Sequence, residues 1–232
     1  MIEIKPIASS SSGNAYIVND GHSPILIECG IQIKRIRQAV NFKLAGIAGA
    51  LVSHYHNDHA GYVKDVMRAG VDVYTSQGTA DELNLSGHRL HIIEPLKQLT
   101  IGSWTILPFE TEHDCKGALG FLLQTSGEKL LFMTDTAYCR YRFKGVTRIM
   151  IECDYQTGYL KNNESYSQAL KNRIIKTHFS LENVLDFLRA TDLSKLQEIW
   201  LIHLSRYNVN PAEAKKAVQR LTGIPVYVAA AE

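Results

Sequence analysis

The sequence predicts an α/β fold in which two stacked mixed β-sheets form the centre and helices lie outside them, a four-layer αββα sandwich. Each half of the chain contains a β-rich segment, and helical segments follow each of them. No linker or low-complexity stretch divides the 232 residues, so we expect a single domain over 1–232.

In the first half, short apolar runs alternate with groups of turn-forming residues such as Ser9 to Gly13 and Asn19 to Gly21. A helix is expected where Ile33, Ile36 and Val40 recur at nearly the helical period. The strands expected in this half are 2–8, 14–19, 24–28, 47–53, 71–74, 90–93 and 99–102, and the helices are 31–43, 61–69 and 79–85.

The second half begins with three stronger strands, and the tight turn Ser126-Gly127 predicts a hairpin between the second and the third. Pro211 suits a first helical turn, with Asn210 as the N-cap residue. The strands expected in this half are 104–109, 118–125, 129–134, 148–153, 198–202 and 226–228, and the helices are 166–176, 181–190 and 211–221.

The composition is that of a water-soluble globular protein, with 45% apolar and 21% charged residues. No apolar run approaches the roughly 20 residues that cross a bilayer, so we expect no membrane association. The first residues contain no basic leader with an apolar stretch, which predicts cytoplasmic residence. The cysteines are widely spaced, which predicts reduced thiols; they are Cys29, Cys115, Cys139 and Cys153.

The net charge of +2 is too small to indicate a nucleic-acid partner by itself. The basic residues are not evenly spread, however, because Lys161, Lys171, Arg173 and Lys176 lie in one stretch with few acids. This stretch is either a solvated helix face or part of a surface that binds an anionic partner.

The strongest chemical signal is the run His54-Tyr55-His56-Asn57-Asp58-His59, which follows an apolar strand and precedes a helix. His54 and His56 project to the same side of an extended segment, while Asp58 and His59 reach a neighbouring position as the chain turns. This spacing favours two adjacent metal ions. The alternative, a chance cluster of cap and turn residues, does not account for three histidines around one aspartate.

This run resembles the H-x-H-x-D-H motif of the metallo-β-lactamase superfamily. The remaining ligands of that superfamily have matches in the expected order at strand ends, namely His113, Asp135 and His203. Each of these alone is also typical of a loop, turn or core residue. The resemblance implies His54, His56 and His113 on a first metal, Asp58, His59 and His203 on a second, and Asp135 together with a hydroxide bridging both.

The metals implied are zinc or manganese, which imidazoles and carboxylates bind well, and two such ions generate hydroxide near neutral pH. Four positive charges on the metals, two carboxylates and one hydroxide leave the centre at +1. An anionic substrate is therefore expected, and phosphodiesters fit.

The flanking segments resemble more specifically the YycJ (WalJ) group of metallo-β-lactamase-fold exonucleases. That resemblance implies that Ser12, Asn14, His178 and Asn208 lie near the substrate. We expect His178 to bind the substrate phosphate or protonate the leaving oxygen, although it is also typical of a residue that precedes a helix. The chain departs from the group at 152–156 and at Lys176-Thr177.

The function expected is that of a phosphodiesterase or nuclease with a bridging hydroxide on a dinuclear metal centre, with Asp58 and His178 as catalytic residues. The substrate is an anionic phosphodiester, either a DNA or RNA end or a small cyclic nucleotide. Thioester or lactone hydrolysis is the alternative enzyme class, while β-lactam hydrolysis and a purely structural metal site fit the sequence less well. The superfamily resemblance also leaves a homodimer open.

Overall fold

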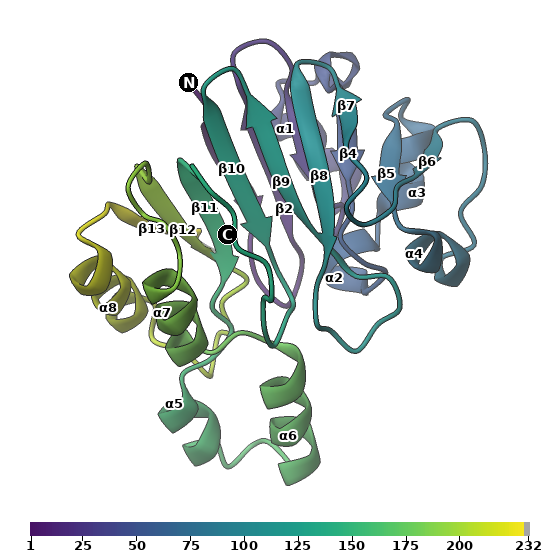
Figure 1. Ribbon diagram of the computed structural model, residues 1–232. Coiled ribbons are helices and arrows are strands. Elements are labelled where there is room, and N and C mark those ends of the chain that lie inside the picture. Colours follow the sequence, from purple (N-terminus) through teal and green to yellow (C-terminus); the bar gives the residue numbers. More distant parts are fainter. Residues whose placement is uncertain (230–232) are drawn as a thin grey trace. The chain divides into compact units, whose positions relative to one another are not determined.

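The computed structural model describes residues 1–229, which form two compact units. Unit 1 comprises Met1–Glu110 and Cys115–Glu128, and unit 2 comprises Thr111–Asp114 and Lys129–Ala229. Both units combine strands with helices, as Figure 1 shows, so the prediction of an α/β protein is confirmed.

Unit 1 contains a six-stranded mixed sheet with the order β1-β2-β3-β4-β5-β6. Its strands are β1 Glu3–Ala8, β2 Ala15–Asn19, β3 Ile25–Ile27, β4 Gly49–Leu51, β5 Val73–Thr75 and β6 Leu90–Ile92. The first three strands pair antiparallel and the last four pair parallel. Strands β3 and β4 are buried throughout, as apolar strands in the middle of a sheet should be.

The other elements of unit 1 are three antiparallel strands and several short helices. The strands are β7 Leu99–Ile101, β8 Trp104–Glu110 and β9 Leu119–Thr125, and the helices are α1 Ile33–Ala39, η1 Leu44–Gly46, α2 Asn57–Ala60, α3 Val63–Arg68 and α4 Gln77–Glu82. Ile36 of α1 and Val66 of α3 pack on one core with Leu26 and Val52 from the sheet. These contacts fix the positions of the segments that follow β3 and β4.

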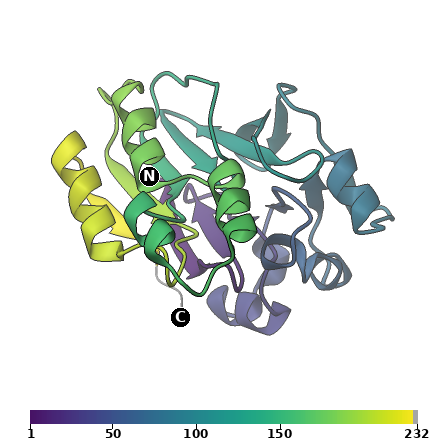
Figure 2. The ribbon, with the colours of Figure 1, turned by 90° about the horizontal axis from the view of Figure 1, so that it is seen from below.

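Unit 2 contains four parallel strands in the order β13-β12-β11-β10. They are β10 Glu128–Met133, β11 Arg148–Glu152, β12 Glu198–Ile202 and β13 Val226–Val228. The helices are α5 Thr157–Asn162, α6 Gln168–Thr177, α7 Leu181–Arg189 and α8 Pro211–Thr222. Helices α7 and α8 lie side by side, as Figure 2 shows, and α8 also contacts β13. The predicted cap of α8 is confirmed, because the Asn210 side chain accepts hydrogen bonds from the amides of Ala212 and Glu213.

Several helices differ from the prediction, among them η1 and α2, which were not predicted, and α4, which begins and ends earlier. Helix α1 ends at Ala39 rather than near Lys43, because Asn41 and Phe42 adopt left-handed backbone conformations that stop a helix. Helix α5 was not predicted, since its six residues include Gly158 and two asparagines follow each other at its end.

No disulfide joins the four cysteines of the described residues, and their reduced state stays a prediction. None of the helices within 1–229 combines the length and the apolarity needed to cross a membrane.

Candidate metal centre

In unit 1 the predicted ligands lie in the segment that follows β4. The Ser53 hydroxyl lies 2.8 Å from His54 Nδ1, and His54 Nε2 lies 3.1 Å from His56 Nδ1. His59 Nε2 lies 3.3 Å from Asp58 Oδ2, and the rings of His54 and His59 are 4.3 Å apart. The structure therefore brings together all four ligands that were predicted from this run.

The backbone around Asn14 holds this segment in place. The Asn14 amide donates to the Asp58 carbonyl at 2.7 Å, and its side-chain nitrogen donates to the same oxygen at 3.1 Å. The Cys29 amide donates to the His59 carbonyl at 2.7 Å. Gly30 is in such close contact that an added Cβ would lie 1.8 Å from the Asp58 carbonyl oxygen. The backbone at Gly30 is therefore in direct contact with the backbone at Asp58.

Glu28 is a residue of this region that the sequence analysis did not single out. Its carboxylate is fully buried at the end of β3, and Oε1 lies 3.6 Å from His59 Nδ1. A carboxylate behind a histidine orients the ring so that its other nitrogen can bind a metal. An acidic residue directly after a fully apolar strand was the signal in the sequence that indicates this role.

In unit 2 three polar residues lie at the carboxyl ends of adjacent parallel strands. Asp135 follows β10, Glu152 ends β11 and His203 follows β12. Because parallel strands bring their carboxyl ends to one edge, these side chains meet together with His178. One ligand-type atom from each of Asp135, Glu152, His178 and His203 lies within 4.8 Å of the others.

Glu152 contacts both histidines of this cluster. In the sequence it was distinguished only as part of the divergent segment 152–156. Its Oε1 accepts hydrogen bonds from His178 Nδ1 at 2.6 Å and from His203 Nδ1 at 3.2 Å. Its Oε2 accepts from the amides of Thr136 and Phe179 at 3.0 and 3.1 Å. Glu152 therefore fixes both imidazoles, and their Nε2 atoms are directed elsewhere.

His113 also belongs to unit 2 and is oriented in the same manner. Its Nδ1 donates to the Thr177 carbonyl at 2.9 Å, which identifies Nδ1 as the protonated nitrogen of a neutral ring. His113 Nε2 lies 3.6 Å from Asp135 Oδ2. Burial lowers the pKa of His113 against the opposing effect of Asp135, and a neutral imidazole is the form that binds metals.

The electrostatics of the Glu152 cluster depend on His178. Burial alone would lower the pKa of His178, but the Glu152 carboxylate and its hydrogen bond, together with Asp135, raise it to about 9. Burial would raise the pKa of Glu152, and the His178 charge lowers it below its usual value. Burial raises the pKa of the neighbouring Asp154 to about 6. The carboxylates of this cluster therefore favour the protonated form of His178.

The donor set fits divalent metal ions. His113 Nδ1 is hydrogen-bonded to the Thr177 carbonyl, and His203 Nδ1 is hydrogen-bonded to the Glu152 carboxylate. His54 Nδ1 has the Ser53 hydroxyl as its partner. In each ring this is the nitrogen that faces away from the proposed ligand position. Such partners orient metal-binding histidines in proteins and increase their basicity. Imidazole and carboxylate groups in this combination suit zinc, manganese and related divalent ions.

The residues predicted to contact substrate differ in their surroundings. Ser12 is exposed, whereas Asn14 is fully buried and binds the backbone of Ser10 and Asp58. Asn208 is also buried, and its side chain donates to Ser205 Oγ and accepts from Asn163. Their contact with substrate stays a prediction, and the hydrogen bonds of the two asparagines show that they order the chain around the clusters.

The solved structure of YhfI from Bacillus subtilis, a metallo-β-lactamase-fold protein, has a similar fold. Its TM-score is 0.79 at 14% identity, with 98% of this chain and 96% of that chain covered. The predicted fold class, with two stacked mixed sheets and helices, is thereby confirmed.

Two curated relatives resemble the chain in sequence. Exodeoxyribonuclease WalJ of Streptococcus pneumoniae is 27% identical over 219 residues, covering 87% of this chain and 81% of the relative. Exodeoxyribonuclease YycJ of Bacillus anthracis is 23% identical over 230 residues, covering 93% of this chain and 87% of the relative. The resemblance to the YycJ group and the expected class of metal-dependent hydrolase are confirmed. The β-lactamase superfamily domain model matches residues 24–204, and the chain belongs to this family.

Proposed function

We propose that this protein is a metal-dependent phosphodiesterase that hydrolyses nucleic acid from an end. The observation that carries the proposal is the strand-end cluster of Asp135, Glu152, His178 and His203, in which a buried carboxylate holds a protonated histidine beside metal-binding groups. The curated relatives, which are named exodeoxyribonucleases, support the choice of DNA as the first substrate to test.

We further propose that the chain holds two divalent ions. The ligands would be His54, His56 and His113 for one ion and Asp58, His59 and His203 for the other, with Asp135 shared. The family match over residues 24–204 includes all of these positions and supports this assignment. When bound, such ions supply a hydroxide nucleophile near neutral pH and stabilise negative charge on phosphate.

His178 is proposed to act on the substrate rather than on a metal. Glu152 accepts the Nδ1 proton at 2.6 Å, so Nε2 is the atom that can reach a phosphate oxygen. Because the Glu152 carboxylate favours the protonated form of His178, this side chain can bind an anionic phosphate or donate a proton to the departing oxygen. Asp58 is proposed as the second catalytic residue, because it would hold the ion that positions the nucleophile.

The experiment uses purified protein loaded with zinc or manganese and offers it labelled DNA, labelled RNA and a panel of cyclic nucleotides. We expect release of nucleotides from the ends of DNA or RNA. Hydrolysis of cyclic nucleotides alone would show a small-molecule phosphodiesterase, and turnover of a thioester or lactone but no phosphodiester would contradict the proposal.

A variant separates metal-dependent turnover from a contaminating nuclease. Asp135→Ala removes a buried carboxylate from the cluster and should abolish activity, whereas Ser194→Ala, at an exposed turn position that is not a proposed ligand, should retain it. Elemental analysis of both proteins determines the metal and its stoichiometry.

Three further properties stay predictions. Cytoplasmic residence is supported by the absence of disulfides among the described cysteines. A single domain over 1–232 is supported by the family match, which extends across residues of both units. Homodimerisation is tested by sedimentation of the purified protein.

A further inference from the structure

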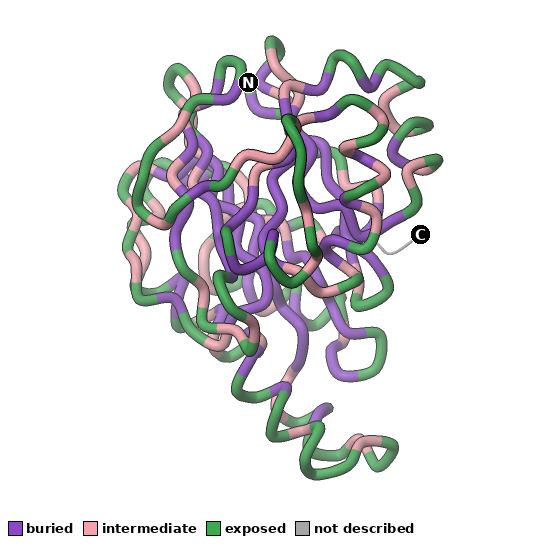
Figure 3. Tube along the Cα trace, turned by 90° about the vertical axis from the view of Figure 1, so that its right-hand side faces the viewer, coloured by how far each residue is buried: buried purple, intermediate pink, exposed green. Residues whose placement is uncertain are grey.

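Helices α5 and α6 and the loop between them form a hairpin, which we call the arm and define as Thr157–Thr177. The arm has a small core of its own, in which Leu160 and Ile174 pack with Tyr155 and Tyr166. Most of its other residues are exposed, as the lowest segment of Figure 3 shows. Such an exposed hairpin contributes little to the main core, which leaves its surface available for binding.

The arm concentrates the positive charge of the protein. It contains Lys161, Lys171, Arg173 and Lys176 but only one acid, Glu164. The whole chain has 25 basic and 23 acidic residues, so 21 and 22 lie outside the arm and the basic excess belongs to the arm. Arg173 pairs with Asp114, whereas Lys161 and Lys176 form no ion pair with any residue of 1–229. A polyanion matches this charge distribution.

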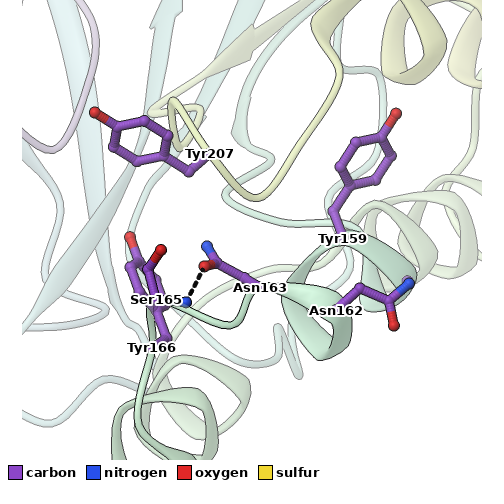
Figure 4. A pocket seen from close by; sticks show the side chains of 7 residues that line it. Tyr159, Asn162, Asn163, Ser165, Tyr166 and Tyr207 are labelled. Atoms are coloured by element: carbon purple, nitrogen blue, oxygen red, sulfur yellow. Dashed lines mark hydrogen bonds between the residues drawn. The ribbon is translucent and has the colours of Figure 1, made fainter.

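One side of the arm borders a hollow of about 910 Å³ with aromatic walls. Tyr159 and Tyr207 lie on two sides of it and Asn163 between them, as Figure 4 shows. The side chains of Tyr159 and Tyr207 are 42% and 66% exposed, which is unusual for such large rings. The Tyr159 hydroxyl donates to Glu213 at 3.2 Å, which orients the ring. Exposed, oriented rings beside asparagine amides are typical of surfaces on which nucleic-acid bases stack.

The residues around the hollow are close in sequence to two histidines of the Glu152 cluster. Helix α6 ends directly at His178, and Tyr207 follows His203 by four residues, which span at most about 14 Å. The Asn163 side chain donates to Asn208 at 2.8 Å and ties the arm to the loop of Tyr207. A second hollow, of about 520 Å³, is lined by His113 and by Lys176 of the arm.

We propose that the arm and the neighbouring loop of Tyr207 bind single-stranded nucleic acid, with bases stacked on Tyr159 and Tyr207 and phosphates near Lys161 and Lys176. This inference rests on the proposed function, because it names the element that would hold the strand next to the cleaved end. It also accounts for the basic stretch that the sequence analysis left open between a solvated face and an anion-binding surface.

The test measures binding of a labelled oligothymidylate with hydrolysis-resistant phosphorothioate links, using the metal-loaded protein and fluorescence anisotropy. Tyr207→Ala and Tyr159→Ala should each weaken binding roughly five- to 150-fold, the range for loss of one base–aromatic stack, while Tyr207→Phe should bind as the wild type does. Tyr227→Ala, which removes a 43% exposed ring from β13, is the matched control and should leave binding unchanged.

The charge contribution is measured separately. Lys161→Gln and Lys176→Gln should each reduce the slope of log affinity against log salt concentration by about 0.7, the value for one phosphate contact on a single strand. A small chromogenic phosphodiester has no neighbouring bases that could stack on the tyrosines. Its turnover by Tyr159→Ala, Tyr207→Ala and Lys161→Gln should therefore equal that of the wild type.

The outcomes separate this inference from the proposed function. Wild-type protein that binds the oligonucleotide through the tyrosines but cleaves no nucleic acid leaves the arm as a binding site and contradicts the proposed function. Protein that cleaves DNA while Tyr207→Ala and Tyr159→Ala retain wild-type affinity overturns the inference. So does dissociation of a dimer by these substitutions without loss of affinity, because the hollow would then bind a second copy of the chain.

Discussion

Replacing Gly30 with alanine should disable the ligand run without touching any ligand side chain. The added Cβ would lie 1.8 Å from the Asp58 carbonyl oxygen and 2.8 Å from the Asn14 amide nitrogen, and both partners are backbone atoms. Since ordinary contact begins at 3.4 Å, the backbone at Asp58 must move by about 1.6 Å. Misplacement of a catalytic group by about 1 Å costs about 100-fold in rate, and forced overpacking costs about 1–3 kcal/mol of stability.

The assay compares kcat/KM, bound metal and the thermal midpoint of Gly30→Ala with those of the wild type. Gly46→Ala is the control, because an added Cβ there meets nothing within 4 Å. We expect Gly30→Ala to lose at least about 100-fold in kcat/KM and part of its metal, with a smaller loss of stability. Wild-type metal content and activity in Gly30→Ala would refute the reasoning, since they would show that the backbone contact does not position Asp58.

Three further predictions concern charge and metal. Asp20 accepts hydrogen bonds from the Ser103 and Thr125 hydroxyls and from two amides, which lower its pKa to about 2 although burial opposes this. Because the pKa is lowered on folding, the carboxylate stabilises the fold above about pH 4 and this contribution is lost as pH falls towards 2. Asp20→Asn should therefore cost about 2 kcal/mol in urea unfolding at neutral pH and about half of that near pH 3, and an equal cost at both pH values would contradict this account. Glu152→Gln removes the negative charge beside His178 and should lower the pKa of His178 from about 9, as followed by NMR of the imidazole ring; an unchanged titration would assign the shift to another group. Removal of divalent ions with a chelator should abolish hydrolysis and lower the thermal midpoint, both restored by zinc or manganese, and a midpoint that does not move would argue against ligand clusters built for metal.

The sequence alone predicted the ligands that a local pattern reveals. The run from His54 to His59 needs only the spacing of an extended segment that enters a helix, and the structure brings its members together. Asp135 and His203 were predicted from the resemblance to the superfamily, whose remaining ligands have matches in the expected order at strand ends. Glu152 and Glu28 were not assigned a role, because their function depends on which histidine packs against each carboxylate. That pairing is set by strand register and by contacts between distant segments, which periodicity does not encode.

The register of unit 2 explains why an aspartate and a histidine occupy the strand ends of the cluster. Met133 pairs with Ile151, and Glu152 pairs with Ile202, so Asp135 and His203 both lie one position beyond the level of Glu152. In a continuing strand their side chains would point to the opposite face from Glu152. Instead both adopt left-handed conformations, with φ of 42° and 50°, and His203 Nδ1 reaches Glu152 at 3.2 Å.

A left-handed conformation costs most residues about 1–2 kcal/mol, and aspartate and histidine are among the few residues other than glycine that occur there often. The chemistry of the ligand and the tolerance of the backbone therefore select the same residue types at Asp135 and His203. Glycine would suit the backbone at these positions but supply no ligand. Glutamate would also supply a ligand, and Glu28 of this chain adopts such a conformation with φ of 67°, but glutamate occurs there less often than aspartate or histidine. In contrast, Glu152 lies within β11 with its side chain already directed at the cluster. Because Glu152 has an ordinary strand conformation, its longer side chain reaches the cluster without a special backbone geometry. Glu152 was therefore less distinctive in the sequence than Asp135 and His203.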